Sequence, residues 1–271
     1  MIIALDTADD PRIAAYRAVR DRDLIRHDGR FIVEGAIALE RLLTASRFPV
    51  ESLLLADNRV APLAPILAHL APDIPVYVTP QSVMDGVTGF PIHRGILALA
   101  RRTQSQTTEQ LIAGLPAGPL TLLVLIGLSN HDNVGGCFRN AAALGASAVL
   151  LDETCCDPLY RKAIRVSSGA ALSLPFAHTG SGAEIIAALI AAGVTPWALS
   201  PSDGAPLTAC DPPDRLALIL GAEGPGLPAD LMALCTRISI PMAGDMDSLN
   251  VATAGAIALS HVLSRRTTSP A

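Results

Sequence analysis

The chain has 271 residues, of which 50% are hydrophobic and 17% are charged, and its formal net charge is −5. This length corresponds to one large or two ordinary domains and can bury a core without disulfides or structural metals. The longest strongly apolar stretches, such as 122–128 and 183–194, are much shorter than the roughly 20 residues of a membrane span. The first residues lack the pattern of a signal peptide, so we expect a soluble cytoplasmic protein.

The negative charge lies in the second part of the chain. Residues 1–102 carry 12 arginines and 12 acidic residues, whereas residues 103–271 carry 8 basic and 13 acidic residues. Residues 12–47 alone hold eight arginines and five acids, which is a local positive excess. An acidic total therefore does not exclude an anionic partner, because a basic segment can bind such a partner locally.

Five cysteines are present, at positions 137, 155, 156, 210 and 235, and none forms a CxxC spacing. An odd number of thiols in this arrangement favours reduced cysteines in a reducing compartment over a disulfide framework. The adjacent pair Cys155–Cys156 leaves a redox role open.

The first hundred residues predict a small α/β domain. An Asp-Pro start and apolar residues interleaved with arginines predict a polar helix over 10–25, and helical spacing predicts another over 35–45. Short apolar runs predict buried strands at 53–56 and 75–78, with a helix over 61–70 between them.

A candidate linker follows at 103–120. It is polar at first and then rich in Gly and Pro, and it lies between two strand-like runs, 95–100 and 121–127. Part of it is compatible with a short helix. We therefore expect an N-terminal domain over 1–102 and a second domain over 121–271.

The second domain alternates strands with helices. The strands are expected at 122–127, 148–151, 197–200, 216–220 and 238–241, and the helices at 134–144, 183–192, 228–234 and 249–264. This alternation predicts a mostly parallel sheet with helices on both faces, and apolar runs such as LLVLI and LALIL are typical of its buried strands. Ligands of such sheets bind beyond the carboxyl ends of the strands, so the loops after the strands form the candidate site.

The first of these loops, with the helix after it, reads SNHDNVGGCFRNA over 129–141. Asp132 and Asn133 are ordinary candidates for the helix N-cap, and Gly135 and Gly136 allow an anion to approach the helix start closely. Arg139 would share the face of these glycines. On this motif alone, Arg139 is either a functional residue or a salt-bridge partner.

The second loop reads GAEGPGLP over 221–228. Three glycines in six residues predict tight turns and exposed backbone N–H and C=O groups. The spacing matches neither the dinucleotide fingerprint nor the phosphate-binding loop of nucleotide hydrolases. Glu223, at the end of a strand, is a candidate ligand for a cation or an arginine, or else a solvated turn carboxylate.

The third loop reads MAGDMDSLN over 242–250. Ser248 is expected to be the N-cap of the last helix. That helix contains Ala, Gly, Ser and Thr among larger apolar residues, and such small residues let another backbone pack closely against it.

Taken together and in this order, the three loops resemble the SpoU/TrmH-type RNA ribose 2′-O-methyltransferases of the SPOUT superfamily. The matching stretches are NVGGCFRNA, LILGAEGPGL and ISIPMAGDMDSLNVATAGAIAL. A fourth stretch, RKAIRVSSGAALSLPF at 161–176, resembles the family's basic segment with its Ser-x-Gly-Ala turn, and the resemblance covers about 150 residues. The N-terminal part, with RFIVEGAIALERLL and GFPIHRGILALARR, more weakly resembles the family's ribosomal-protein-like substrate-binding domain.

This resemblance implies that the C-terminal domain contains a deep trefoil knot, formed by loops 221–227 and 242–249, which binds S-adenosylmethionine. It also implies a homodimer with the site near the subunit interface. The implied reaction is in-line attack of a ribose 2′-hydroxyl on the sulfonium methyl group, for which no metal is needed. The implied cofactor-binding residues are Leu220, Gly221, Gly224, Gly226, Ile240, Met242, Ser248 and Leu249.

Five residues match the family's catalytic motifs, namely Asn133, Arg139, Glu223, Ser248 and Asn250. Arg139 matches the catalytic arginine, which is sometimes described as a general base. Because guanidinium groups are protonated at neutral pH, we expect it to orient the substrate and stabilise charge instead. Asn133 would contact the substrate or support the arginine, and Glu223 would hold Arg139 or the substrate. Ser248 and Asn250 would shape the site.

RNA would be bound through arginines rather than through aromatic stacking, because only 3% of the residues are aromatic. A separate N-terminal domain of this size slightly favours rRNA over tRNA as the substrate. The candidates for phosphate contacts are Arg12, Arg17, Arg20, Arg26, Arg30, Arg161, Lys162 and Arg165.

Two other functions remain open at this point. A non-catalytic RNA-binding protein could keep the same scaffold, although the intact motif residues count against it. A nucleotide-dependent oxidoreductase on a Rossmann-like sheet would be expected to carry the GxGxxG fingerprint, which is not found here.

Overall fold

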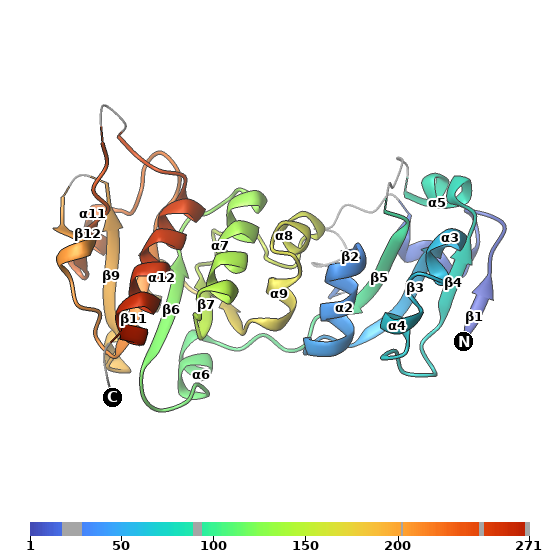
Figure 1. Cartoon of the computed structure of the whole chain (residues 1–271), viewed down its shortest axis with the longest axis horizontal. Coiled ribbons are helices and arrows are strands. Elements are labelled where there is room, and N and C mark those ends of the chain that lie inside the picture. The colour runs from blue at the N-terminus through green and yellow to red at the C-terminus, as the bar shows by residue number, and fades with distance from the viewer. Residues whose placement is uncertain (18–28, 89–93, 202, 244–246, 269–271) are drawn as a thin grey trace. The chain divides into compact units, whose positions relative to one another are not determined.

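The computed structural model describes residues 1–17, 29–88, 94–201, 203–243 and 247–268 (Figure 1). The chain forms two compact units. Unit 1 comprises Met1–Gln104 and Leu159–Ser173, and unit 2 comprises Ser105–Pro158 and Leu174–Ala271. The domain boundaries expected from the sequence remain a prediction. The structure adds that Leu159–Ser173, which follows the expected linker in the sequence, packs within unit 1.

Unit 1 contains a five-stranded mixed sheet in the order β1-β4-β3-β5-β2. Its strands are β1 (Ile2–Ala4), β2 (Arg30–Glu34), β3 (Val50–Ala56), β4 (Val76–Thr79) and β5 (Ile96–Arg101). The pairs of β4 are parallel and the pairs of β5 are antiparallel. The helices are η1 (Pro11–Tyr16), α2 (Ala36–Ala45), α3 (Asp57–Val60), α4 (Ala64–Leu67), α5 (Gln81–Thr88), α8 (Arg161–Val166) and α9 (Ala170–Ser173).

Two expectations for unit 1 are wrong in the described residues. The polar helix over 10–25 is a short 3-10 helix, η1, after which Arg17 is extended, and residues 18–25 lie outside the described residues. The helix over 61–70 is replaced by the short helices α3 and α4. Two prolines at 62 and 65 explain this break, because proline has no backbone N–H to donate inside a helix.

Unit 2 contains a seven-stranded sheet in the order β10-β12-β9-β11-β6-β7-β8, in which every strand pair is parallel. The mostly parallel sheet predicted for this part of the chain is thus confirmed. The strands are β6 (Leu120–Leu125), β7 (Ala148–Leu151), β8 (Phe176–His178), β9 (Thr195–Ser200), β10 (Ala205–Pro206), β11 (Arg215–Leu220) and β12 (Thr236–Ser239). The sequence did not predict the short strands β8 and β10.

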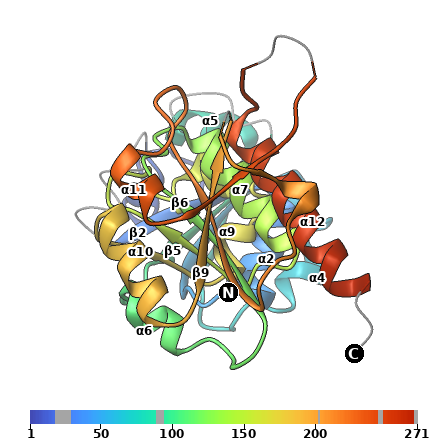
Figure 2. The same cartoon turned by 90° about the vertical axis from the view of Figure 1, so that its left-hand side faces the viewer.

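Helices cover both faces of this sheet, with α7 and α12 on one side and α6 and α10 on the other (Figure 2). The helices of unit 2 are α6 (Thr108–Ala113), α7 (His131–Ala143), α10 (Gly182–Ala191), η3 (Leu207–Ala209), α11 (Ala229–Ala233) and α12 (Val251–Thr268). Successive residues of a strand face opposite sides. Accordingly, Leu122 and Val124 pack in a core cluster with residues of α6 and α10.

Helices α7 and α12 lie side by side (Figure 1) and pack closely through small residues. A Cβ atom placed on Gly136 would lie 3.0 Å from the Cβ of Ala252. Asn140 donates from Nδ2 to the carbonyl of the same Ala252 at 2.8 Å. This packing fixes the amino-terminal ends of both helices, and therefore the two loops that precede them, relative to one another.

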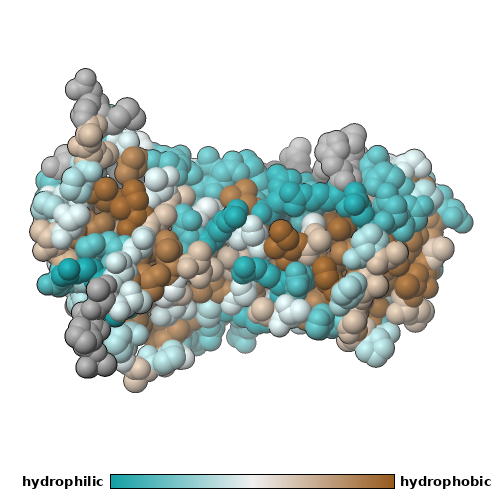
Figure 3. Space-filling view, viewed as in Figure 1, coloured by the Kyte–Doolittle hydropathy of each residue, from teal (hydrophilic) through white to brown (hydrophobic). Residues whose placement is uncertain are grey.

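In the described part of the chain, no helix is both long enough and apolar enough to cross a membrane. On the face seen in Figure 3, the hydrophobic areas are interrupted by hydrophilic residues.

Candidate functional site

A cavity of about 640 Å³ lies in unit 2 at the carboxyl ends of β9, β11 and β12. Its volume falls within the roughly 300–1,000 Å³ of small-molecule sites. The loop after β11, the described residues of the loop after β12 and the start of α12 form its walls. All eight residues expected to bind a cofactor line it, namely Leu220, Gly221, Gly224, Gly226, Ile240, Met242, Ser248 and Leu249.

The loop after β11 folds back on itself. A Cβ atom on Gly221 would lie 2.4 Å from the backbone nitrogen of Leu227, so this position accepts only glycine. Gly224 and Gly226 have φ angles of 85° and 69°, a conformation that favours glycine. The N–H of Gly226 donates to the carbonyl of Ala222 at 3.0 Å and closes the turn. The tight turns predicted for this loop are confirmed.

Asn250 connects three segments of the site. Its Oδ1 accepts hydrogen bonds from the N–H groups of Ala252 at 3.0 Å and Thr253 at 3.3 Å, which is the arrangement of a helix N-cap. Its Nδ2 donates to Asn133 Oδ1 at 2.9 Å and to Glu223 Oε1 at 3.2 Å. Three of the five expected catalytic residues therefore form one hydrogen-bonded cluster.

Asn133 is the buried member of this cluster, with 6% of its surface exposed. It lies in the first turn of α7, which begins at His131 rather than at residue 134. The N-cap of this helix is Asn130, whose Oδ1 accepts from the N–H of Asp132 at 2.8 Å. The expectation that Asp132 or Asn133 caps the helix is thus wrong, and Asn133 is left to bond Asn250.

Arg139 is exposed on α7, one turn after Gly135 and Gly136. Glu223 is also exposed, and its carboxylate accepts a hydrogen bond from Asn250 rather than from Arg139. Among the described residues, the Arg139 guanidinium makes no hydrogen bond or ion pair. An uncompensated positive charge on this helix is available to a ligand.

Ser248 lines the cavity, but it does not cap the last helix as the sequence predicted. Helix α12 begins at Val251, and Asn250 supplies the capping oxygen. The hydroxyl of Ser248 donates to Asp247 Oδ1 at 3.4 Å. Ser248 is exposed, so its hydroxyl can also meet a bound molecule.

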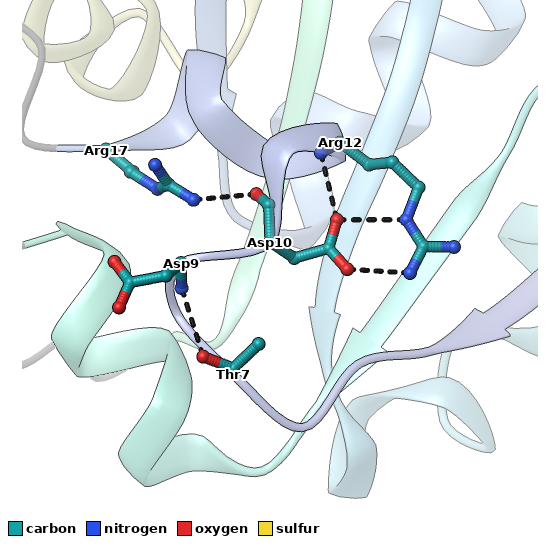
Figure 4. A network of polar contacts seen from close by, with 5 residues as sticks. All are labelled: Thr7, Asp9, Asp10, Arg12 and Arg17. Carbon is teal, nitrogen blue, oxygen red and sulfur yellow. Dashed lines mark hydrogen bonds and ion pairs between the residues drawn. The ribbon is translucent and has the colours of Figure 1, made fainter.

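The arginines expected to contact RNA phosphates are partly engaged within unit 1. Arg12 forms a two-pronged contact with the carboxylate of Asp10, and Arg17 donates to the carbonyl of Asp10 at 2.8 Å (Figure 4). Arg17 also donates to the carbonyl of Ala8 at 2.9 Å. The hydrogen bond from Arg12 lowers the pKa of Asp10 to about 2. Arg12 therefore faces a carboxylate that is ionised at every physiological pH.

A second group of these basic residues surrounds Glu34, which is buried in β2. Arg161 Nε and Arg165 Nη1 lie 3.9 Å and 3.7 Å from Glu34 Oε2. Arg30 lies 3.9 Å from a carboxylate oxygen of Glu51. Lys162 lies beside these arginines in α8, whereas Arg20 and Arg26 lie outside the described residues.

Asp152 is a polar residue of the site region that the sequence did not single out. It is buried directly after β7, with 4% of its surface exposed. Its carboxylate accepts from the N–H groups of Gly127 at 3.0 Å and Cys155 at 3.1 Å, and from Thr154 Oγ1 at 2.8 Å. Asp152 thus fixes the start of the loop that leads to α7. An acid directly after an apolar strand was the signal that would have identified it.

Of the adjacent cysteines after β7, Cys155 is buried and Cys156 is partly buried. Burial raises the pKa of the Cys155 thiol, and it raises the pKa of Cys156 to about 12. Cys155 Sγ donates to the carbonyl of Leu125 and accepts from the N–H of Leu128, both at 3.3 Å. Because the thiolate is the reactive form, these shifts argue against the redox role that the sequence left open.

In the described ranges, no group of three or more His, Cys, Asp and Glu side chains is arranged to hold a metal ion.

Comparison with known proteins places this site in a family. Residues 121–260 match the SpoU rRNA Methylase family. A protein of Mycobacterium tuberculosis, described as an uncharacterized tRNA/rRNA methyltransferase, is 39% identical over 263 residues, covering 92% of this chain and 88% of the relative. The 23S rRNA (guanosine-2'-O-)-methyltransferase RlmB of Ralstonia nicotianae is 34% identical over 190 residues, covering 69% of this chain and 75% of the relative.

The fold agrees with this assignment. The crystal structure of an AdoMet-bound rRNA methyltransferase from Sinorhizobium meliloti matches with a TM-score of 0.83 at 22% identity, covering 99% of each chain. The family resemblance predicted from the three loops is therefore confirmed, and the chain belongs to the SpoU rRNA methylase family.

Proposed function

We propose that the protein is an S-adenosylmethionine-dependent enzyme that methylates a ribose 2′-hydroxyl in structured RNA. The observation that carries this proposal is the joining of Asn133, Glu223 and Asn250 at the cavity whose walls hold the expected cofactor residues. The relative in Ralstonia nicotianae, named as a guanosine-2'-O-methyltransferase of 23S rRNA, supports the same reaction.

The cavity fits the proposed cofactor chemically. Leu220, Ile240, Met242 and Leu249 give it apolar walls on which an adenine ring can lie. The folded loop from Gly221 brings backbone N–H and C=O groups to the same cavity, and these can read the polar edge of a base. When bound, S-adenosylmethionine supplies an activated methyl group.

Arg139 would act as a charged orienting group. Guanidinium groups stay protonated at neutral pH, and the exposed side chain on α7 has no carboxylate partner among the described residues. It would attract an RNA phosphate and stabilise negative charge that develops on the ribose oxygen. Asn133 and Glu223, held by Asn250, would position the nucleotide, and Ser248 would supply a further hydroxyl.

Several finer features belong to the same proposal. The chain would pass through a trefoil knot, which requires segments to pack closely. The tight loop after Gly221 suits this, as does Gly255, where an added Cβ atom would lie 2.9 Å from Cδ1 of Leu220. The N-terminal unit would be a ribosomal-protein-like RNA-binding domain, and rRNA is the preferred substrate over tRNA. The protein would act in the cytoplasm as a homodimer, for which Ile257 and Leu263 of α12, each 39% exposed, offer apolar surface.

The test is to map 2′-O-methyl groups in total RNA from cells with and without the gene, and from cells that carry Arg139→Ala. We expect one or a few sites to disappear in the deletion and in the variant, while the purified variant still binds S-adenosylmethionine. Arg265→Ala is the matched control, because this exposed arginine lies at the far end of α12 with Asp211. Normal methylation by Arg139→Ala would refute its role. Failure of the wild-type protein to bind the cofactor would instead favour a non-catalytic RNA-binding protein.

A further inference from the structure

Asp203 is an acidic residue of the cavity wall that belongs to none of the three motif loops. It follows β9 on the short connection to the edge strand β10 and lines the cavity together with Ser200. The carboxyl ends of parallel strands are where α/β sheets bind their ligands. Asp203 therefore occupies a position at which a side chain can meet a bound cofactor.

Asp203 and Gly204 are held by contacts with residues of β9 and β12. Ser200 Oγ donates to Asp203 Oδ1 at 2.6 Å, and Arg237 of β12 donates to Asp203 Oδ2. Ser239 Oγ donates to the carbonyl of Gly204 at 3.2 Å. A Cβ atom on Gly204 would lie 2.8 Å from the backbone of Arg237, so Gly204 lies directly on β12. A carboxylate held in this way is preorganised for binding.

The carboxylate is charged and still accessible. The hydrogen bonds from Ser200 and Arg237 lower the pKa of Asp203 below its usual value, so it is ionised at neutral pH. Each of its oxygens receives one donor from the protein, yet 53% of the side chain is exposed. A carboxylate offers about four acceptor positions. Acceptor positions are thus left for a donor that enters the cavity.

The charges around the cavity favour a ligand with N–H or O–H donors or a positive charge. Asp203, Glu223 and Asp247 line it, and the lining residues that the structure describes include no lysine, arginine or histidine. Arg237 offsets Asp203 from outside the lining, and Asn250 bonds Glu223. A net positive cofactor with a ribose diol and an ammonium group is a suitable partner for this surface.

We propose that Asp203 is a cofactor-binding residue, whose carboxylate accepts a hydrogen bond from the ribose hydroxyls or the ammonium group of S-adenosylmethionine. This inference rests on the proposed function. Ser200 and Arg237 both bond this carboxylate and neither is required to touch the cofactor, and Ser200 still holds it when Arg237 is replaced.

Calorimetric titration of the full-length protein with S-adenosylmethionine tests the inference through two variants. Asp203→Asn keeps the size of the side chain and removes its charge, whereas Arg237→Met breaks the same ion pair and keeps the carboxylate. Hydrogen bonds to charged groups are strong enough that we expect Asp203→Asn to weaken binding about tenfold or more. Arg237→Met should change it by less than about threefold, because an exposed ion pair contributes little.

Two further ligands identify the donor. S-adenosylhomocysteine and methylthioadenosine both carry a neutral thioether, but only the former has an ammonium group. A loss of affinity in Asp203→Asn for both ligands assigns the contact to the ribose, and a loss for S-adenosylhomocysteine alone assigns it to the ammonium group.

Equal losses in Asp203→Asn and Arg237→Met, or no loss in Asp203→Asn, would overturn the inference and leave the proposed function intact. If the wild-type protein binds no S-adenosylmethionine, the proposed function fails and this inference fails with it.

Discussion

Replacing Asn250 should damage both the stability of unit 2 and the candidate site, and the two effects can be separated. Its amide has only one orientation that satisfies the structure. Oδ1 must face the N–H groups of Ala252 and Thr253, so Nδ2 must face the acceptors on Asn133 and Glu223. One side chain thus caps α12 and joins the first two loops of the site.

The cost of Asn250→Ala follows from these contacts. Loss of an N-cap costs about 1 kcal/mol. Asn133 is buried, so its Oδ1 would lose its partner away from water, which costs about 1–3 kcal/mol. The bond to the exposed Glu223 adds little. The sum is about 2–4 kcal/mol.

Asn250→Ser separates the two contributions, because a serine hydroxyl also caps a helix but cannot replace the amide donor to Asn133. In thermal unfolding followed by circular dichroism, we expect Asn250→Ala to lower Tm by about 5–15 °C. Asn250→Ser should recover about 2–4 °C of this loss, yet methylation should be reduced equally in both variants. A wild-type Tm for Asn250→Ala, or full activity in Asn250→Ser, would refute this reasoning.

Three further predictions concern other parts of the chain. Gly221→Ala should weaken S-adenosylmethionine binding more than tenfold in calorimetry, since its Cβ would lie 2.4 Å from a backbone nitrogen of the same loop; unchanged binding would contradict this. Arg266→Met should lower Tm by about 2–8 °C, because this guanidinium donates to Thr121 and to three carbonyls, whereas Arg265→Met, which breaks only an exposed ion pair, should not. The Asp10 carboxyl should titrate near pH 2 by NMR and move towards 4 in Arg12→Ala. Its folded-state pKa is depressed, so the stabilisation from this ion pair is present above about pH 4 and is lost as the pH falls towards 2. An unchanged titration would show that Arg12 is not the cause.

The sequence was informative where the chain has strong local rules. Buried parallel strands such as β7 and β11 are continuous apolar runs, so their existence and approximate ends could be predicted. The glycines of the loop after β11 predicted tight turns because few other residues adopt positive φ. The position of that loop after a strand then predicted a binding site, and the cavity lies there.

The sequence was misleading where two neighbouring residues could each perform the same local task. Ser248 and Asn250 are both good N-caps, and the choice between them depends on where α12 meets α7. Gly136 and Ala252 allow this close approach and bring Asn250 next to Asn133, which is 117 positions away in the chain. Local propensity contains no information on such a contact, so the capping residue could not be decided from it.

For the segment Leu159–Ser173, the sequence also did not predict with which unit it packs. It resembles a family motif of the methyltransferase domain, but it packs within unit 1. Ser168 and Gly169 both have positive φ, and a Cβ on Gly169 would lie 3.2 Å from the Cα of Ala38 in α2. The Ser-x-Gly-Ala turn is therefore explained by close packing on a helix. In the same segment, Arg161 and Arg165 lie near the buried Glu34.

The charges around the cavity limit how RNA, the proposed substrate, can approach this acidic protein. Three carboxylates among the described lining residues, those of Asp203, Glu223 and Asp247, would repel phosphates. Arg139, by contrast, makes no ion pair among the described residues. For the proposed reaction we therefore expect a nucleotide to turn its ribose towards the cavity and its phosphates towards α7. An arginine that must attract those phosphates has to remain charged, which is a physical reason to assign Arg139 an orienting role rather than that of a general base.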